Sequence, residues 1–266
     1  MLDKSKFAIL RAAKRVWAVA AIHGEAKRLE RIHTQVAERF EPGDRLVYLG
    51  NFLGHGGEIC ATLDALLLFR RKLLAEPGVM ACDVVFLRGA QEEMWSKLMQ
   101  LQFALDPAGV LAWMLERGLD ATLEAYGGDP RGGLARARLG ATDLAHWTGE
   151  LRTSMQSNPG HYVLMSALRR VAFTDDGALL FVNAGVDVSR PLDAQDDALW
   201  WGGANFDAIS GPYGGFKMIV RGFDRNRKGV NFTTYTATLD AGCGFGNPLN
   251  AGCFDAEGRL VELIEG

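Results

Sequence analysis

Residues 45–58 read Arg-Leu-Val-Tyr-Leu-Gly-Asn-Phe-Leu-Gly-His-Gly-Gly-Glu, and this stretch decides the fold. The apolar run at 45–49 predicts a buried strand, and the glycines of 50–57 predict a loop at the carboxyl end of that strand. A helix is expected from about 58 to 74, because basic residues near the end of this range suit the negative C-terminal end of a helix.

The same arrangement extends on both sides of this stretch. Residues 16–22 form a continuous apolar run, which predicts a strand buried on both faces. Residues 25–40 predict a helix with one apolar face, and residues 83–87 predict a third strand. Strands and helices that alternate at this spacing indicate parallel strands joined by right-handed crossovers.

After residue 92 the expected secondary structure changes twice, first to helices and then back to strands. Residues from 92 to about 169 are expected to be mostly helical, with an exposed Gly- and Arg-rich loop at 127–139. The absence of an internal repeat or linker favours one α/β domain over residues 1–266, with a helical insertion at about 92–169. Further strands are predicted at 178–182, 216–220, 231–239 and 260–264.

Composition narrows the class of protein. The chain has 266 residues, is 48% hydrophobic and 23% charged, and carries a formal net charge of -3. These values exclude disordered, collagen-like and coiled-coil proteins. A nearly neutral chain gains little electrostatically from polyanions, so we expect neither a nucleic-acid partner nor a membrane partner.

The spacing of the cysteines and the lack of a long apolar stretch bear on the cellular compartment of the protein. The sequence has four cysteines, none in a Cys-x-x-Cys pair and none with the His spacing of a zinc site. We therefore expect reduced, buried thiols in a cytoplasmic protein. No apolar stretch approaches the roughly 18 residues that span a bilayer, and we interpret residues 16–22 as a core strand.

Function in open α/β sheets collects on loops at the carboxyl ends of strands. Here the residues at such ends share glycines and small polar side chains, and they recur in a fixed order along the chain. The loops read Ala20-Ala21-Ile22-His23-Gly24, Gly50-Asn51-Phe52-Leu53-Gly54-His55-Gly56, Arg88-Gly89-Ala90-Gln91-Glu92, Val182-Asn183-Ala184-Gly185 and Val220-Arg221-Gly222-Phe223.

In this order the loops resemble those of the calcineurin-like metallophosphoesterases, in the bacterial serine/threonine protein phosphatase branch close to diadenosine tetraphosphate hydrolases. That family carries Gly-Asp-x-His-Gly, Gly-Asp-x-x-Asp-Arg-Gly, Gly-Asn-His-Glu, His-Ala-Gly and Gly-His. Residues 118–127, 195–200 and 239–243 also resemble family segments, so the likeness covers almost the whole chain. It implies an α/β/β/α sandwich of two mixed sheets flanked by helices, and a metal-dependent phosphoric ester hydrolase.

The departures from the family pattern fall on its metal ligands. The family holds two divalent metals such as Mn²⁺, and a pair of dications needs carboxylate charge because the ions repel each other. Only His23 stands as the pattern has it. The changed ligand positions are Ala21, Asn51, Ala90, Asn183 and Phe223.

The residues that assist the family's chemistry have changed as well. The proton-donating His of the family falls at Gln91, and the Asp that orients it falls at Gly54. Two Arg positions of the family fall at His55 and Gly202. The loop glycines remain, so the resemblance implies a retained scaffold with no catalytic residues and no metal cofactor.

Three hypotheses follow. The first is a pseudophosphatase that binds a protein partner or a phosphorylated ligand without cleaving it. The second is a divergent metal-dependent phosphoesterase with a relocated site. Its candidate ligands are His23, His55, Glu58, Glu92 and Asp224. The third is a structural or assembly role, in which side chains fill the old cleft.

The first hypothesis also predicts where an anion would bind. His23, His55 and Arg221 are expected to approach the place of the lost metals, and a guanidinium is suited to bidentate phosphate contact. The alternative is an internal ion pair of Arg221 with Asp224 or Asp240, which leaves nothing for a ligand.

Overall fold

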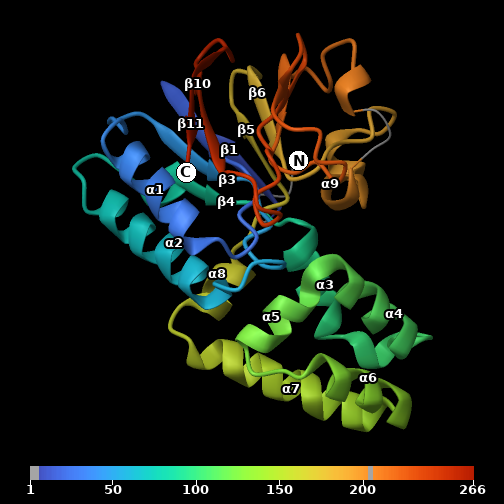
Figure 1. The fold of residues 1–266 in the computed structure, drawn as a ribbon. Coiled ribbons are helices and arrows are strands. Elements are labelled where there is room, and N and C mark those ends of the chain that lie inside the picture. The colour runs from blue at the N-terminus through green and yellow to red at the C-terminus, as the bar shows by residue number, and fades with distance from the viewer. Residues whose placement is uncertain (1–5, 203–205) are drawn as a thin grey trace.

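Two β-sheets packed face to face form the centre of the protein, in a computed structural model that describes residues 6–202 and 206–266 (Figure 1). A five-stranded sheet has the order β11-β10-β2-β3-β4, and a six-stranded sheet has the order β1-β5-β6-β7-β9-β8. Both sheets contain parallel and antiparallel pairs. The strands are β1 (Phe7–Leu10), β2 (Arg15–Val19), β3 (Arg45–Tyr48), β4 (Val84–Phe86), β5 (Val171–Thr174), β6 (Leu179–Val182), β7 (Met218–Arg221), β8 (Asn231–Phe232), β9 (Thr236–Thr238), β10 (Asn250–Asp255) and β11 (Leu260–Glu265).

Helices α1 (Ala26–Ala37) and α2 (Ile59–Leu74) lie side by side on the outer face of the five-stranded sheet (Figure 1). The buried residues Leu29, Ile32 and Val36 recur every three or four positions along α1, which gives the helix its apolar face. Together with the parallel order β2-β3-β4, these helices confirm the expected α/β unit and the sandwich class.

Strand β6 shows why the second sheet is apolar on both faces. Leu179 and Phe181 belong to the main core between the sheets, where Phe181 packs edge-on against Phe254 of β10. Leu180 and Val182 belong to a second core on the outer face. That outer core is closed by residues 186–202 and 206–216, which include α9 (Ala198–Trp201). A strand with both faces buried is therefore a continuous apolar run.

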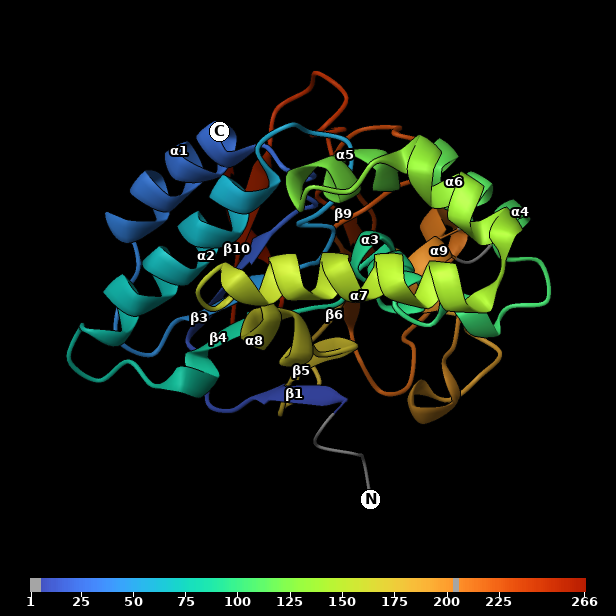
Figure 2. The same ribbon diagram turned by 90° about the horizontal axis from the view of Figure 1, so that it is seen from below.

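A helical lobe lies between β4 and β5 in the sequence and below the sandwich in Figure 1. Seen from below in Figure 2, α7 crosses this end of the molecule. No helix of the described residues is long and apolar enough to cross a membrane. The helices of the lobe are α3 (Ala90–Leu98), α4 (Pro107–Met114), α5 (Asp120–Ala125), α6 (Pro130–Leu139), α7 (Ala141–Ser157) and α8 (His161–Ser166).

The expected loop at 127–139 is wrong, because most of it forms α6. Asp129 caps this helix by accepting hydrogen bonds from the backbone N–H groups of Arg131 and Gly132, and Pro130 occupies the first turn. Gly133 lies against the Trp147 ring of α7, where an added Cβ would stand 2.4 Å from the ring. The glycine that suggests a loop instead allows two helices to approach closely.

Strands were the other source of error. The single strand expected at 231–239 is a hairpin of β8 and β9, with residues 233–235 in the turn. Strands β1, β5 and β10 were not expected. β1 pairs with β5, and β10 pairs with β2, so these strands depend on partners that are distant in the sequence.

Candidate functional site

The carboxyl ends of β2, β3, β4, β6 and β7 meet at one end of the sandwich. The backbone N–H of Ala21 donates to the Gly222 carbonyl at 2.9 Å and so joins the loops after β2 and β7. The side-chain amide of Asn183, after β6, donates to the Leu49 carbonyl, after β3, at 2.7 Å. The five loops that resemble the metallophosphoesterase motifs therefore come together, as expected from the strand order.

The buried carboxylate of Glu92 holds these loops in shape. It accepts four backbone N–H bonds of 2.8–3.1 Å, from Asn51, Phe52, Leu53 and Gly89. Burial raises the pKa of the Glu92 carboxyl, although these hydrogen bonds oppose the shift. Both oxygens are occupied by the protein's own backbone, so Glu92 is a structural anchor of the loop between β3 and α2.

The positions of the family's metal ligands hold side chains with no charge. Ala21 and Ala90 are buried and offer no ligand atom. The Asn51 Oδ1 atom accepts from the Gln91 N–H at 3.1 Å, and the Asn183 Oδ1 atom accepts from the Ala90 N–H at 3.3 Å. Each amide oxygen that could replace a carboxylate is thus already used to join two loops.

His23 lies at the centre of the site among aromatic rings. Its ring centroid is 5.0 Å from that of His55, 5.6 Å from that of Phe223 and 5.7 Å from that of Phe245. The Nδ1 atom donates to the Leu53 carbonyl at 3.2 Å, while the buried Nε2 atom has no hydrogen-bond partner among the residues that the structure describes. Burial, with a smaller effect of His55, lowers the pKa of His23 to about 3, so the imidazole is neutral.

Gln91 stands at the position of the family's proton-donating His, and a hydrogen bond holds its side chain in place. Its side-chain N–H donates to the Arg117 carbonyl at 2.7 Å and lies 3.4 Å from the His55 Nε2 atom. A Cβ on Gly54 would stand 2.3 Å from the Gln91 side chain, so an Asp at position 54 does not fit beside this glutamine. An amide N–H is not acidic at neutral pH. The His and Asp that supply acid catalysis in the family are therefore both absent from positions 91 and 54.

Arg221 is directed toward protein groups. It donates to Thr238 Oγ1 at 2.8 Å, lies 3.5 Å from carboxylate oxygens of both Asp207 and Asp224, and stacks on the Phe206 ring at 4.4 Å. Burial lowers the pKa of its guanidinium, and the neighbouring carboxylates oppose that shift. The structure brings His23 and His55 together, while Arg221 makes an internal pair with Asp224 that the sequence left open as the alternative.

The other candidate ligands of a relocated metal site are dispersed. Glu58 lies 3.4 Å from Lys27, and Asp224 accepts from the backbone of Asn226 and Lys228 as well as pairing with Arg221. Over residues 6–202 and 206–266, no three His, Cys, Asp or Glu side chains are grouped so that they could hold a metal ion.

The donor set does not fit the two divalent metals that the family implies. At the ligand positions themselves, the buried His23 Nε2 atom is without a hydrogen-bond partner among the described residues, and no side chain is a carboxylate. The nearby Glu92 carboxylate is already bonded to four backbone N–H groups. A hard dication prefers about six oxygen ligands that include carboxylates, and two adjacent dications need that negative charge still more.

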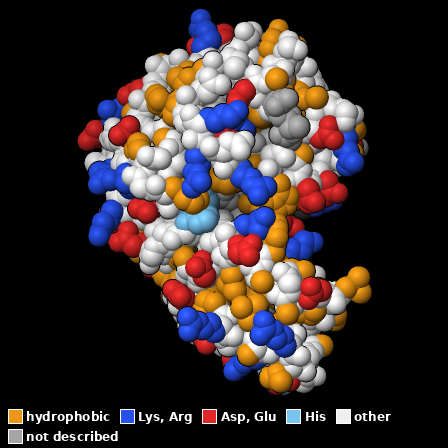
Figure 3. All heavy atoms as spheres, turned by 45° about the vertical axis from the view of Figure 1, so that its right-hand side comes forward, with side chains coloured by type: hydrophobic (Ala, Val, Ile, Leu, Met, Phe, Trp, Pro, Cys, Tyr) orange, Lys and Arg blue, Asp and Glu red, His pale blue; other side chains and the backbone are white. Residues whose placement is uncertain are grey.

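Two residues of the site had no functional signal in the sequence. Phe245 packs on His55 with ring centroids 4.4 Å apart, and the Arg227 guanidinium lies 4.3 Å above the same Phe245 ring. The Gly242–Gly246 segment was the available clue, because a Cβ on Gly244 would stand 2.4 Å from the His23 side chain. Figure 3 shows Lys and Arg side chains around a histidine where the sandwich meets the helical lobe.

Three solved structures with a similar fold are described as phosphatases. A protein assigned as a diadenosine tetraphosphatase has a TM-score of 0.59 and 18% identity, with 98% of each chain covered. A cold-active protein tyrosine phosphatase from Shewanella has a TM-score of 0.56 and 13% identity, covering 98% of this chain and 83% of that one. A protein serine/threonine phosphatase from Saccharomyces cerevisiae has a TM-score of 0.53 and 11% identity, covering 98% and 82%.

These likenesses confirm the calcineurin-like fold that the loops led us to expect, and at such identities they establish the fold alone. No protein-family model matches the sequence, and no curated protein sequence matches it significantly.

Proposed function

We propose that this chain, which has the calcineurin-like phosphatase fold, is a pseudophosphatase that acts by binding a protein partner or a phosphorylated ligand. One observation carries the proposal. At the five changed ligand positions every side chain is apolar or an amide, and both amide oxygens accept backbone hydrogen bonds from neighbouring loops.

Phosphoester hydrolysis in the family needs metal ions and a proton donor, and the residues that would supply them are absent here. Metal ions in phosphoesterases generate a hydroxide at neutral pH and stabilise the charge on the phosphoryl oxygens. A single neutral imidazole, at His23, supplies neither function. The Gln91 amide cannot donate a proton to a leaving group, because its N–H is not acidic in water.

The retained framework supports a binding role. The side chains of Glu92, Asn51 and Asn183 join three of the loops by hydrogen bonds. The backbone carbonyls of Asn51 and Asn183 accept from the other two, at His23 and Phe223, so this end of the sandwich presents an ordered surface. Of the three residues predicted to contact an anion, His55 is half-buried, whereas His23 and Arg221 are buried. We also propose a reducing, cytoplasmic location, supported by four free cysteines. The expectation of buried thiols holds for Cys243 and Cys253, but Cys60 is half-buried and Cys82 is exposed.

A reversion series tests the loss of catalysis. The wild type and each single variant should not turn over a generic phosphomonoester in millimolar Mn²⁺, because residues that act as a unit contribute non-additively. Turnover should need the five changes together. These are Ala21→Asp, Asn51→Asp, Ala90→Asn, Asn183→His and Phe223→His.

Two outcomes would contradict the proposal. One is Mn²⁺-dependent turnover by the wild type that His23→Asn abolishes. The other is turnover by Asn51→Asp alone, because a single carboxylate would then complete a metal site that the structure does not account for. A Leu68→Ser variant, on the exposed side of α2, is the control for general effects of substitution.

A further inference from the structure

A pocket of about 390 Å³ lies between α3 and α4 of the helical lobe and α9 of the sandwich. Most of its lining is apolar, and Met94, Val110 and Met114 contribute to it. Pockets that bind small molecules have volumes of about 300–1,000 Å³ and are lined mainly by apolar and aromatic side chains with few polar groups. None of the lining residues belongs to the five loops of the candidate functional site, so this pocket is separate from it.

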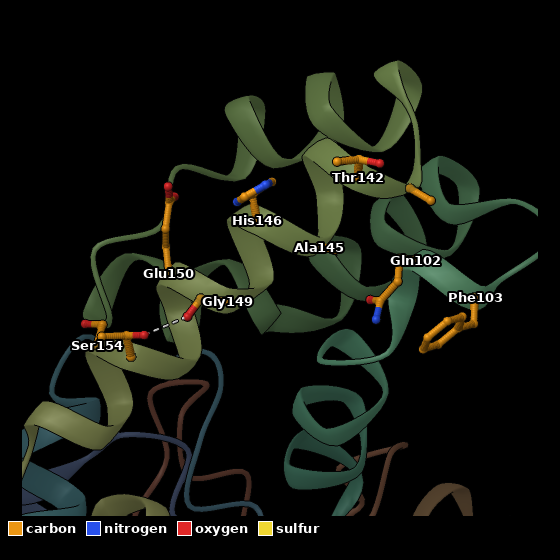
Figure 4. A pocket seen from close by; sticks show the side chains of 10 residues that line it. Gln102, Phe103, Thr142, Ala145, His146, Gly149, Glu150 and Ser154 are labelled. Atoms are coloured by element: carbon orange, nitrogen blue, oxygen red, sulfur yellow. Dashed lines mark hydrogen bonds between the residues drawn. The ribbon is translucent and has the colours of Figure 1, made fainter.

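A larger hollow of about 1040 Å³ shares Phe103 with this pocket and lies against α7 (Figure 4). Its α7 side is mainly polar, because Thr142, His146 and Glu150 line it. The smaller pocket therefore has the lining that is more typical of a ligand site.

Two indole rings from distant parts of the chain meet in the smaller pocket. The rings of Trp113, on α4, and Trp201, on α9, lie edge to face with centroids 5.3 Å apart. The Arg117 guanidinium lies 4.1 Å from the centroid of Trp113, so that ring already has a cation of the protein on one face. The face of an indole attracts cations more strongly than that of other aromatic side chains.

Three ionisable side chains line the pocket, and they differ in their partners. Glu93 lies 3.0 Å from Arg88 and 3.7 Å from Lys97, so the charges of Glu93 and Lys97 are both paired. The Asp197 carboxylate has no ion pair or hydrogen bond with any residue that the structure describes. The Trp201 N–H donates to the Asp197 carbonyl at 2.8 Å, which places the unpaired carboxylate one helical turn from the second indole.

We propose that this pocket binds a small organic molecule that has an aromatic body and an ammonium group. The ammonium group pairs with the Asp197 carboxylate beside the Trp201 ring, since a carboxylate and an indole face both favour a positive charge. The aromatic body packs against the methionine and indole side chains, which make favourable contacts with rings.

Isothermal titration calorimetry of the full-length protein at pH 7 tests the proposal with four probes. Phenethylammonium has both the ring and the positive charge. Phenethyl alcohol lacks the charge, phenylacetate reverses it, and n-butylammonium lacks the ring. Phenethylammonium should bind with a Kd below about 1 mM, and each of the other probes should bind at least about tenfold more weakly.

Three variants locate the binding. Asp197→Asn should weaken the binding of phenethylammonium at least about tenfold and leave that of phenethyl alcohol unchanged, because it removes only the charge. Asp196→Asn is the matched control, since it removes the same charge from a neighbour that does not line the pocket, and it should bind as the wild type does. Ala104→Leu should weaken the binding of both compounds, because it fills part of the pocket from a half-buried position.

Thermal melting should show that the three variants are folded, and the four probes also test the wild type by itself. A Kd above about 1 mM for phenethylammonium overturns the proposal. So does equal binding of phenethylammonium and any other probe, because the pocket would then not select a ring that carries a positive charge. An Asp197→Asn variant that binds phenethylammonium no more weakly than Asp196→Asn overturns it as well.

Discussion

His23 occupies the one position where this sequence keeps a ligand residue of the family pattern, but its surroundings could not be predicted from that pattern. Phe245 belongs to a different loop more than two hundred residues away, and it closes over His23 and His55 only in the folded chain. At this position the chain has a neutral imidazole enclosed by rings, held in the left-handed region at φ 52°.

This burial predicts a pH effect on stability. The pKa of His23 is about 3 in the folded protein and 6.5 ordinarily. Below pH 6.5 the unfolded chain binds a proton that the folded chain does not, so stability falls as the pH is lowered toward 3. Between pH 7 and pH 5 the wild type should lose about 2 kcal/mol more free energy of unfolding than His23→Asn, which cannot titrate and tolerates this backbone.

Urea unfolding at the two pH values measures the difference. His33, also buried with its pKa lowered to about 3, is common to both proteins, so its contribution cancels. Equal losses in the wild type and in His23→Asn would show that His23 is not held neutral by burial.

At the scale of elements, α3 and the loop after β3 depend on one carboxylate. Glu92 lies in the first turn of α3 and accepts four backbone hydrogen bonds from this loop and from Gly89. Glu92→Gln should lower the free energy of unfolding by about 3 kcal/mol, because an amide turns two donors toward the buried N–H groups and leaves them unpaired. Chemical denaturation followed by circular dichroism measures this change.

Glu93→Gln is the neighbouring control. Glu93 makes ion pairs with Arg88 at 3.0 Å and with Lys97 at 3.7 Å at the edge of the structure, and such pairs contribute no more than about 1 kcal/mol. If Glu92→Gln were no more destabilising than Glu93→Gln, the loops would be held by something other than this carboxylate.

Elements with a strong local pattern could be predicted, and those that depend on distant partners could not. The range 25–40 contains α1, and 58–74 contains α2, because each pattern is complete within its own residues. Strand β5 was missed since its parallel partner β1 lies far from it in the sequence, at residues 7–10. Helix α6 was missed because Gly132 and Gly133 suggest a loop unless the Trp147 ring beside them is known.

The whole molecule combines the fold of solved phosphatases with loops that lack most metal-ligand residues of the calcineurin-like family. Two sheets and their covering helices match solved phosphatases over 98% of the chain, while the loops that carry chemistry in the family hold alanine, amide and aromatic side chains. The Arg221–Asp224 pair was the alternative that the sequence left open. The Arg221–Asp207 pair and the aromatic cluster could not be predicted from the loops alone, because Asp207 and Phe245 lie outside them.

Thermal melting in the presence of Mn²⁺ tests this central claim most directly. A ligand that binds only the folded protein adds about 2.7 kcal/mol of stability at a hundredfold excess over its Kd, enough to raise the Tm by several degrees. With no carboxylate at the ligand positions, the account predicts the same Tm in millimolar Mn²⁺ as in a chelator. A saturable rise of several degrees in the wild type, absent from His23→Asn, would contradict it.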